Sequence, residues 1–123
     1  MELKLNKPQL QQTDLKIGNI LNYDTSEGEI LPTIIDWQDI KWLTEDPKGF
    51  NLVHSGIMLD EEISKKLGFD VIQEGWIGLN GLTWNVYDKY LRYNGQQLCE
   101  TNYIHELQNT YYCITGVMLY LQD

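Results

Sequence analysis

The fold of this chain is most constrained by two Asn-Gly pairs, at residues 80–81 and 94–95. A two-residue type I′ turn needs positive φ at both of its central positions, and Asn followed by Gly accepts this conformation most readily. Each pair therefore predicts a β-hairpin. Together they predict a three-stranded antiparallel meander, with strands at residues 71–79, 82–93 and 96–100.

A short helix is predicted near residues 60–67, before the meander. The carboxylate of Asp60 can accept hydrogen bonds from the unpaired amides of a first helical turn. Glu61 and Glu62 follow it, and their negative charge suits the positive end of the helix dipole. Gly68 can end the helix in the left-handed conformation.

A longer helix is predicted near residues 103–115, after the meander. Asn102 can cap its start, and Gly116 can end it. Apolar side chains recur at intervals of three and four residues and form one stripe along this helix. The stripe consists of Ile104, Leu107, Tyr111 and Ile114.

Alternating or Ile-rich segments predict further strands in the remaining chain. Pro32 falls inside one of them and indicates an edge strand or a bulge, because proline has no N–H group to donate to a central ladder. Since strands come in runs with helices placed between them, the predicted fold class is α+β, as an antiparallel sheet or a partly open barrel. The further strands are expected at residues 15–21, 29–37, 52–57 and 117–121, with a turn at 24–28 and a loop at 44–49.

The length of 123 residues suits a single domain, which is expected over residues 1–123 with residues 1–12 as a loose polar arm. A domain of this length buries enough surface to be stable without a disulfide or a metal. The two cysteines, Cys99 and Cys113, are therefore interpreted as small buried residues.

The formal net charge is −9, from 18 acidic and 9 basic residues. Affinity for nucleic acid depends largely on Lys and Arg, and the basic residues here are few and scattered, so no nucleic-acid partner is expected. No apolar run approaches the roughly 18 residues that span a bilayer, and the first residues lack the pattern of a signal peptide. A cytoplasmic protein without a membrane partner is expected. Its charge is compatible with a basic protein partner.

The sequence offers little for catalysis or metal binding. Its two histidines, His54 and His105, belong to no cluster with metal-ligand spacing. The glycines of residues 75–81 lead into a hairpin rather than a helix, which does not fit a phosphate-binding loop. His105 and Glu106 are adjacent, so on a helix their side chains point apart. No catalytic residue, metal or cofactor is predicted, and the protein is expected not to be an enzyme.

The second face of the last predicted helix is polar. Its residues follow the spacing i, i+3, i+4 and i+7, which brings a titratable ring, two amides and a phenol within reach of one another. One interpretation is a solvated face, or amides that tie the helix to a neighbouring loop. The other is a recognition surface with several donors and acceptors. The residues of this face are His105, Gln108, Asn109 and Tyr112.

Residues 103–116, which form this helix, resemble the closing motif of a family of small proteins from Bacteroidetes phages and prophages. The typical family motif begins Tyr-Ile/Val-His-Gln-Leu-Gln-Asn, and this chain differs from it at Glu106. Residues 15–19 are similar to the family's Leu-Arg-Ile-Gly-Asn opening, and residues 59–69 to its short helix ending in Gly-Phe. The family has no assigned activity, so the resemblance implies a phage or prophage origin rather than a specific function. In that setting small acidic proteins bind a host protein or sequester a signalling molecule.

Two functions are consistent with the sequence. The first is a non-enzymatic protein that sequesters a small polar or aromatic ligand, such as a nucleotide-type host immune signal, with Lys89 or Arg92 contacting any phosphate. The alternative is an acidic protein-interaction factor that binds a host or phage protein. The sequence leaves homo-oligomerisation open. The predicted ligand-binding residues are His105, Gln108, Asn109, Tyr112, Trp84 and Arg92.

Overall fold

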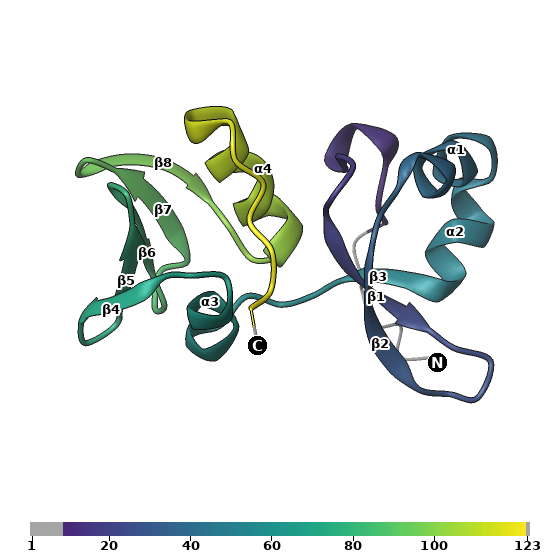
Figure 1. Ribbon diagram of the computed structural model, residues 1–123, viewed down its shortest axis with the longest axis horizontal. Coiled ribbons are helices and arrows are strands. Elements are labelled where there is room, and N and C mark those ends of the chain that lie inside the picture. Colours follow the sequence, from purple (N-terminus) through teal and green to yellow (C-terminus); the bar gives the residue numbers. More distant parts are fainter. Residues whose placement is uncertain (1–8, 123) are drawn as a thin grey trace, which may run out of the picture. The chain divides into compact units, whose positions relative to one another are not determined.

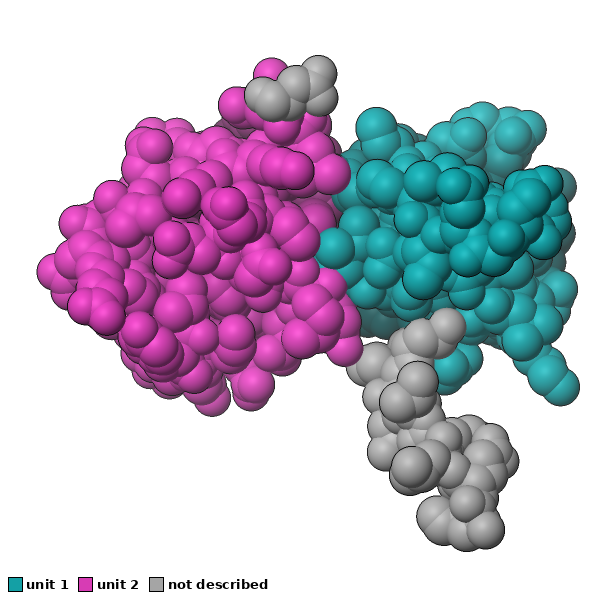
Figure 2. Space-filling model, turned by 90° about the horizontal axis from the view of Figure 1, so that it is seen from below, with its two compact units in different colours: residues 1–57 teal, residues 58–123 magenta. Residues whose placement is uncertain are grey.

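The computed structural model describes residues 9–122 (Figure 1). The described residues form four α-helices and two open antiparallel sheets of three and five strands, which confirms the α+β class. The sequence predicted one domain over residues 1–123, whereas the chain divides into two compact units, residues 1–57 and 58–123 (Figure 2). Each unit has its own sheet and its own helices. Among the described residues, no helix is long and apolar enough to cross a membrane.

Unit 1 contains a three-stranded antiparallel sheet in the order β2-β1-β3. Two helices lie between the second and third strands of the chain. Residues from both helices, Leu43 and Phe50, are buried in one core with Leu21 of the sheet. The elements are a 3₁₀ turn η1 (Gln12–Asp14), β1 (Ile20–Asp24), β2 (Ile30–Ile34), α1 (Trp37–Glu45), α2 (Pro47–Val53) and β3 (His54–Gly56).

The two helices of unit 1 correct the sequence prediction, which continued a strand to residue 37 and placed a loop at residues 44–49. Asp36 caps α1 by accepting a hydrogen bond from the Asp39 N–H at 3.0 Å, and Asp39 accepts one from the Asp36 N–H. Asp46 caps α2, and Pro47 occupies its first turn, where a missing N–H costs nothing. The Asp residue before each of these helices was therefore a recognisable signal of a helix start in the sequence.

The start of the described chain is packed rather than loose. Leu10 is buried, and its backbone is held on both sides by the side chain of Asn51. The Leu10 N–H donates to Asn51 Oδ1 at 2.7 Å, and Asn51 Nδ2 donates to the Leu10 carbonyl oxygen at 3.1 Å. The predicted loose arm is therefore wrong for residues 10–12, which are held by hydrogen bonds, and residues 1–8 lie outside the described part.

β2 is an edge strand, as Pro32 predicted. Hydrogen bonds from Thr25 N to Glu29 O and from Ile35 N to Asn19 O, both 2.8 Å, fix the phase of the β1–β2 ladder. Pairs of an antiparallel ladder alternate between bonded and non-bonded. The Asn22–Pro32 pair is therefore a non-bonded one, and the Pro32 nitrogen points away from β1.

Unit 2 contains a five-stranded antiparallel meander with its strands in chain order. The predicted three strands become five because the first two are each broken by a turn, at residues 74–75 and 86–89. Gly75 and Lys89 have positive φ in these turns. The elements are α3 (Glu61–Lys66), β4 (Asp70–Gln73), β5 (Trp76–Leu79), β6 (Leu82–Asn85), β7 (Tyr90–Tyr93), β8 (Gln96–Glu100) and α4 (Ile104–Thr115).

Both edge strands of the meander carry a bulge. In β4 the pairing shifts between Val71 and Gln73, which leaves Ile72 as the extra residue. In β8 the partners of Leu91 and Arg92 are Cys99 and Gln97, which leaves Leu98 as the extra residue. Bulges of this kind twist an edge and interrupt its row of backbone groups.

The predicted turns and helix ends of unit 2 are confirmed at four places. Asn80 and Gly81 have φ of 51° and 87°, and the second Asn-Gly pair has 50° and 86°. Asp60 Oδ1 accepts from the Ile63 N–H at 2.8 Å. Gly116 ends α4 with φ of 78°, but the N-cap is Tyr103, one residue later than predicted.

The apolar stripe of α4 is buried at Ile104, Leu107 and Tyr111, and this helix lies along one side of the sheet (Figure 1). Two other predictions for unit 2 are wrong. Residues 117–121 form no strand, although the Gln122 N–H donates to the Lys66 carbonyl oxygen at 2.7 Å. Both cysteines are exposed: Cys99 lies on β8, whose five residues are all exposed, and Cys113 lies outside the buried stripe of α4.

The two Asn-Gly turns provide a matched stability test. A methyl group at Gly95 would meet nothing within 4 Å, whereas one at Gly81 would lie 2.8 Å from Asn94 Oδ1. Gly95→Ala is expected to lower the free energy of unfolding by about 1 kcal/mol through left-handed strain. Gly81→Ala is expected to lower it further in chemical denaturation. Equal losses would show that the Asn94 side chain moves aside without cost.

Candidate functional site

The predicted polar face of α4 is not one accessible surface. Gln108 is fully buried, and its Nε2 donates to the Leu119 carbonyl oxygen at 2.8 Å. His105 is also buried, with its ring stacked near Tyr103 at a centroid distance of 5.7 Å. Asn109 is half-buried, and only Tyr112 is exposed among the four. For Gln108, the structure supports the interpretation in which an amide ties the helix to a neighbouring segment.

Trp84 belongs to the core rather than to an open binding face. Its side chain is fully buried, and the indole N–H contacts the carbonyl oxygens of Thr101 at 3.0 Å and Lys89 at 3.2 Å. The Lys89 ammonium lies 5.0 Å from the ring centroid. In this arrangement the ring has no open face on which a ligand base could stack.

Arg92 is engaged within its own sheet. Its guanidinium donates to Asp88 Oδ2 at 2.8 Å and lies 4.9 Å from the ring centroid of Trp76. The hydrogen bond from Arg92 holds the pKa of Asp88 below its ordinary value of 3.8, and a backbone hydrogen bond from Tyr90 acts in the same direction. A phosphate would have to displace this carboxylate from Arg92.

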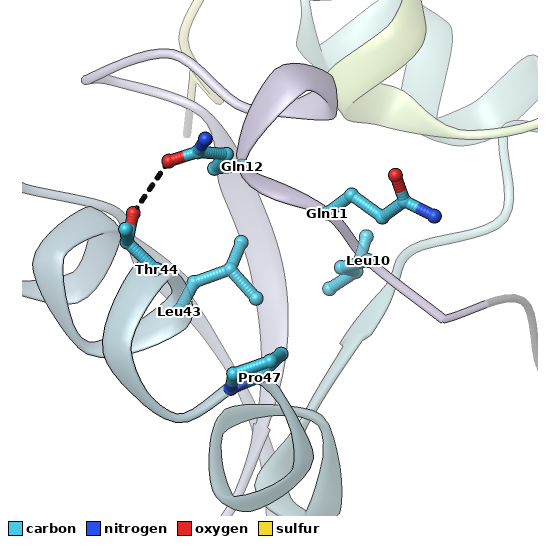
Figure 3. A pocket seen from close by; sticks show the side chains of 6 residues that line it. All are labelled: Leu10, Gln11, Gln12, Leu43, Thr44 and Pro47. Carbon is cyan, nitrogen blue, oxygen red and sulfur yellow. Dashed lines mark hydrogen bonds between the residues drawn. The ribbon is translucent and has the colours of Figure 1, made fainter.

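A pocket of about 210 Å³ lies in unit 1 beside the first described residues (Figure 3). Thr44 Oγ1 at its rim is 2.7 Å from Gln12 Oε1 and 2.8 Å from the Ile40 carbonyl oxygen. The Thr44 hydroxyl at this pocket is therefore already engaged within the protein. The lining residues are Leu10, Gln11, Gln12, Leu43, Thr44 and Pro47.

A second pocket of about 210 Å³ lies in unit 2, where Leu67, Leu79 and Tyr111 meet the C-terminal segment. The Tyr111 hydroxyl there accepts a hydrogen bond from Asn80 Nδ2 at 2.7 Å. Pockets for drug-sized ligands measure roughly 300–1,000 Å³. Neither of the two pockets therefore suits the enclosure of a nucleotide-sized ligand. In the part of the chain that is described, no group of three or more His, Cys, Asp or Glu side chains could hold a metal ion.

Among the described residues of unit 1, β2 carries a stripe of exposed apolar side chains. Ile30 is 63% exposed and Ile34 is 66% exposed, and Pro32 between them is also exposed. Alternate residues of a strand project to the same side, so these three side chains form one stripe. The stripe is about 13 Å long, because each residue of a strand advances the chain by about 3.3 Å.

Acidic residues flank this stripe at both ends in the sequence. Residues 24–39 contain five acidic and no basic residues. The carboxylates of Asp24, Glu27 and Glu29 form no ion pair with the described residues, and Asp24 pairs directly with Ile30 across the ladder. We call Ile30, Pro32 and Ile34, together with Asp24, Glu27 and Glu29, the hairpin surface.

Sequence reasoning identified the edge strand but not this surface. The signal was a run of apolar residues, Ile30 to Ile35 broken by Thr33, placed between acidic residues on both sides. Alternation alone does not say which face of a strand the helices will cover. The helices of unit 1 pack against Leu21 on the other face, whereas Ile30 and Ile34 are exposed on this one, although Ile20, the cross-strand partner of Ile34, is buried.

Gln108 provides a test of the structural role of the α4 polar face. Gln108→Leu would leave the Leu119 carbonyl oxygen without its amide donor, so the free energy of unfolding is expected to fall by about 1–3 kcal/mol. Tyr112→Phe, on the exposed side of the helix, is the control and should change it by less than about 0.5 kcal/mol. A stable Gln108→Leu variant in thermal or chemical denaturation would contradict the structural role.

The Asp88–Arg92 pair gives a pH test. Asp88 has a lowered pKa in the folded state, so its stabilisation is present above the ordinary pKa and is lost as pH falls through the lowered value. In Arg92→Gln, the pKa of Asp88, followed by NMR titration, is expected to rise towards 3.8. An unchanged pKa would mean that Arg92 is not the main cause of the shift.

No protein-family model matches this chain, and neither a curated protein nor a solved structure shows significant similarity to it.

Proposed function

We propose that this chain is a non-enzymatic interaction factor that binds a protein partner through the hairpin surface. The proposal is carried by one observation: Ile30 and Ile34 are both more than 60% exposed on the same side of an edge strand. Contiguous exposed apolar side chains rimmed by polar groups are typical of protein-binding sites. The alternation of the β1–β2 ladder keeps both side chains on that side.

The geometry favours a protein over a small ligand. An extended stripe of about 13 Å on a strand offers no enclosure, whereas small molecules bind in concave sites that bury most of their surface. Trp84, Gln108 and Arg92, which sequence reasoning assigned to a ligand, are occupied by contacts inside unit 2. Sequestration of a nucleotide-type signal therefore has less support than a protein interaction.

The resemblance of residues 103–116 to a phage and prophage family suggests where the partner belongs. In that setting the partner would be a host or phage protein of the bacterial cytoplasm. The net charge of −9 favours a basic partner, because opposite charge accelerates association and suppresses like-charged competitors.

Site-specific photo-crosslinking in the cells that naturally express the protein tests this function. A photo-reactive amino acid is placed at Ile34, or at Leu52 of the same unit, which is 70% exposed and lies on α2. We expect a covalent adduct with one partner from position 34, and its loss when Ile30→Thr is added. The Thr side chain keeps the β-branched shape that suits a strand.

Two results of this experiment would contradict the proposal. Equal yields of the same adduct from positions 34 and 52 would show that the crosslink reports exposure rather than binding. The absence of any adduct from position 34 would leave the hairpin surface without a partner.

A further inference from the structure

The backbone edge of β2 decides how a partner can approach the hairpin surface. An exposed edge strand commonly recruits another strand, which pairs with its outward N–H and C=O groups. By the phase of the β1–β2 ladder, the outward groups of β2 belong to Ile30, Pro32 and Ile34. Pro32 has no N–H, so an added strand would lose the central one of three donors.

The side-chain stripe remains open although the backbone edge is interrupted. Ile30, Pro32 and Ile34 project to one side of the sheet, and all three are exposed. Pro32 adds apolar area to the stripe at the same position where it removes a donor. The apolar side chains of a partner can therefore contact the stripe without pairing with the backbone.

The negative charge near the stripe favours a positively charged partner. Asp36 and Asp39 are occupied by the start of α1, but Asp24, Glu27 and Glu29 form no ion pair with the described residues. A second copy of this chain would bring a second net charge of −9, and a nucleic acid would bring phosphates. Both are opposed by like charge, whereas Lys and Arg beside apolar side chains would be attracted.

We infer that the hairpin surface binds an amphipathic cationic segment of a partner protein by side-chain contact rather than by strand addition. The segment places apolar side chains on Ile30, Pro32 and Ile34 and places Lys or Arg beside the carboxylates of the turn. This inference rests on the proposed function and names the class of partner. Salt weakens such binding, because the carboxylates are exposed.

The test uses the full chain and two synthetic helical peptides with the same apolar pattern, one of Leu and Lys and one of Leu and Glu, followed by fluorescence anisotropy. The Leu/Lys peptide is expected to bind and the Leu/Glu peptide is not. Ile30→Thr with Ile34→Thr is expected to weaken binding by about tenfold or more. Glu27→Gln with Glu29→Gln is expected to weaken it and to reduce its dependence on salt.

Matched variants control for exposure and net charge. Leu52→Gln with Val117→Thr removes two exposed apolar side chains elsewhere, and Glu62→Gln with Glu74→Gln removes two negative charges from unit 2. Both pairs are expected to change the dissociation constant by less than about twofold. If either control weakened binding as much as its hairpin counterpart, or if the Leu/Glu peptide bound equally well, the inference would be overturned.

Pro32→Val separates the two binding modes. Valine keeps an apolar side chain on the stripe and restores the outward N–H. Side-chain contact predicts an unchanged affinity for the Leu/Lys peptide. An affinity increased by about tenfold would instead indicate strand addition and would overturn the inferred mode.

The proposed function and the inferred cationic partner are contradicted by different results. A partner crosslinked at position 34 whose capture is unaffected by Glu27→Gln with Glu29→Gln would overturn the cationic partner and leave the proposed function standing. If position 34 yields no adduct in cells, the proposed function fails, whatever the peptides show.

Discussion

The open edges of the two sheets limit how this fold can pair with other chains. An antiparallel sheet that does not close leaves a row of backbone donors and acceptors at each edge. β2 carries Pro32 at its central outward position, and the edge strands of the meander carry bulges at Ile72 and Leu98. β3 has only three residues, His54–Gly56. Each of these edges is therefore short or interrupted, which disfavours pairing with an added strand.

Local sequence signals predicted the parts of the fold that local chemistry decides. The Asn-Gly turns, the Asp60 cap and the Gly116 end each need only their own neighbours, and all three are present in the structure. Lys89 has a φ of 67° that its residue type does not suggest. Its backbone is held by the Thr101 N–H at 2.7 Å, from twelve residues later in the chain. Such a contact leaves no pattern in a local window, so the break in the predicted long strand was missed.

The candidate site was harder to predict because exposure depends on what covers an element. Helical spacing correctly placed Gln108 on a different face from Leu107, but it did not show that the segment around Leu119 lies against that face. At β2, Pro32 indicated an edge strand or a bulge, but the sequence did not show which side chains of the strand would be covered. Ile30 and Ile34 are exposed, while Leu21 of the neighbouring strand is buried against the helices of unit 1.

Asn51 has a consequence for how unit 1 can change in evolution. Its amide pairs with both backbone groups of Leu10, as a peptide group of a neighbouring strand would. The first described residues are thus joined to α2 by one side chain in place of a strand. Asp would lack the donor and Leu would lack both groups. The N-terminal segment and α2 are therefore expected to change together in evolution, because a replacement of Asn51 would leave the Leu10 N–H and carbonyl groups without these hydrogen bonds.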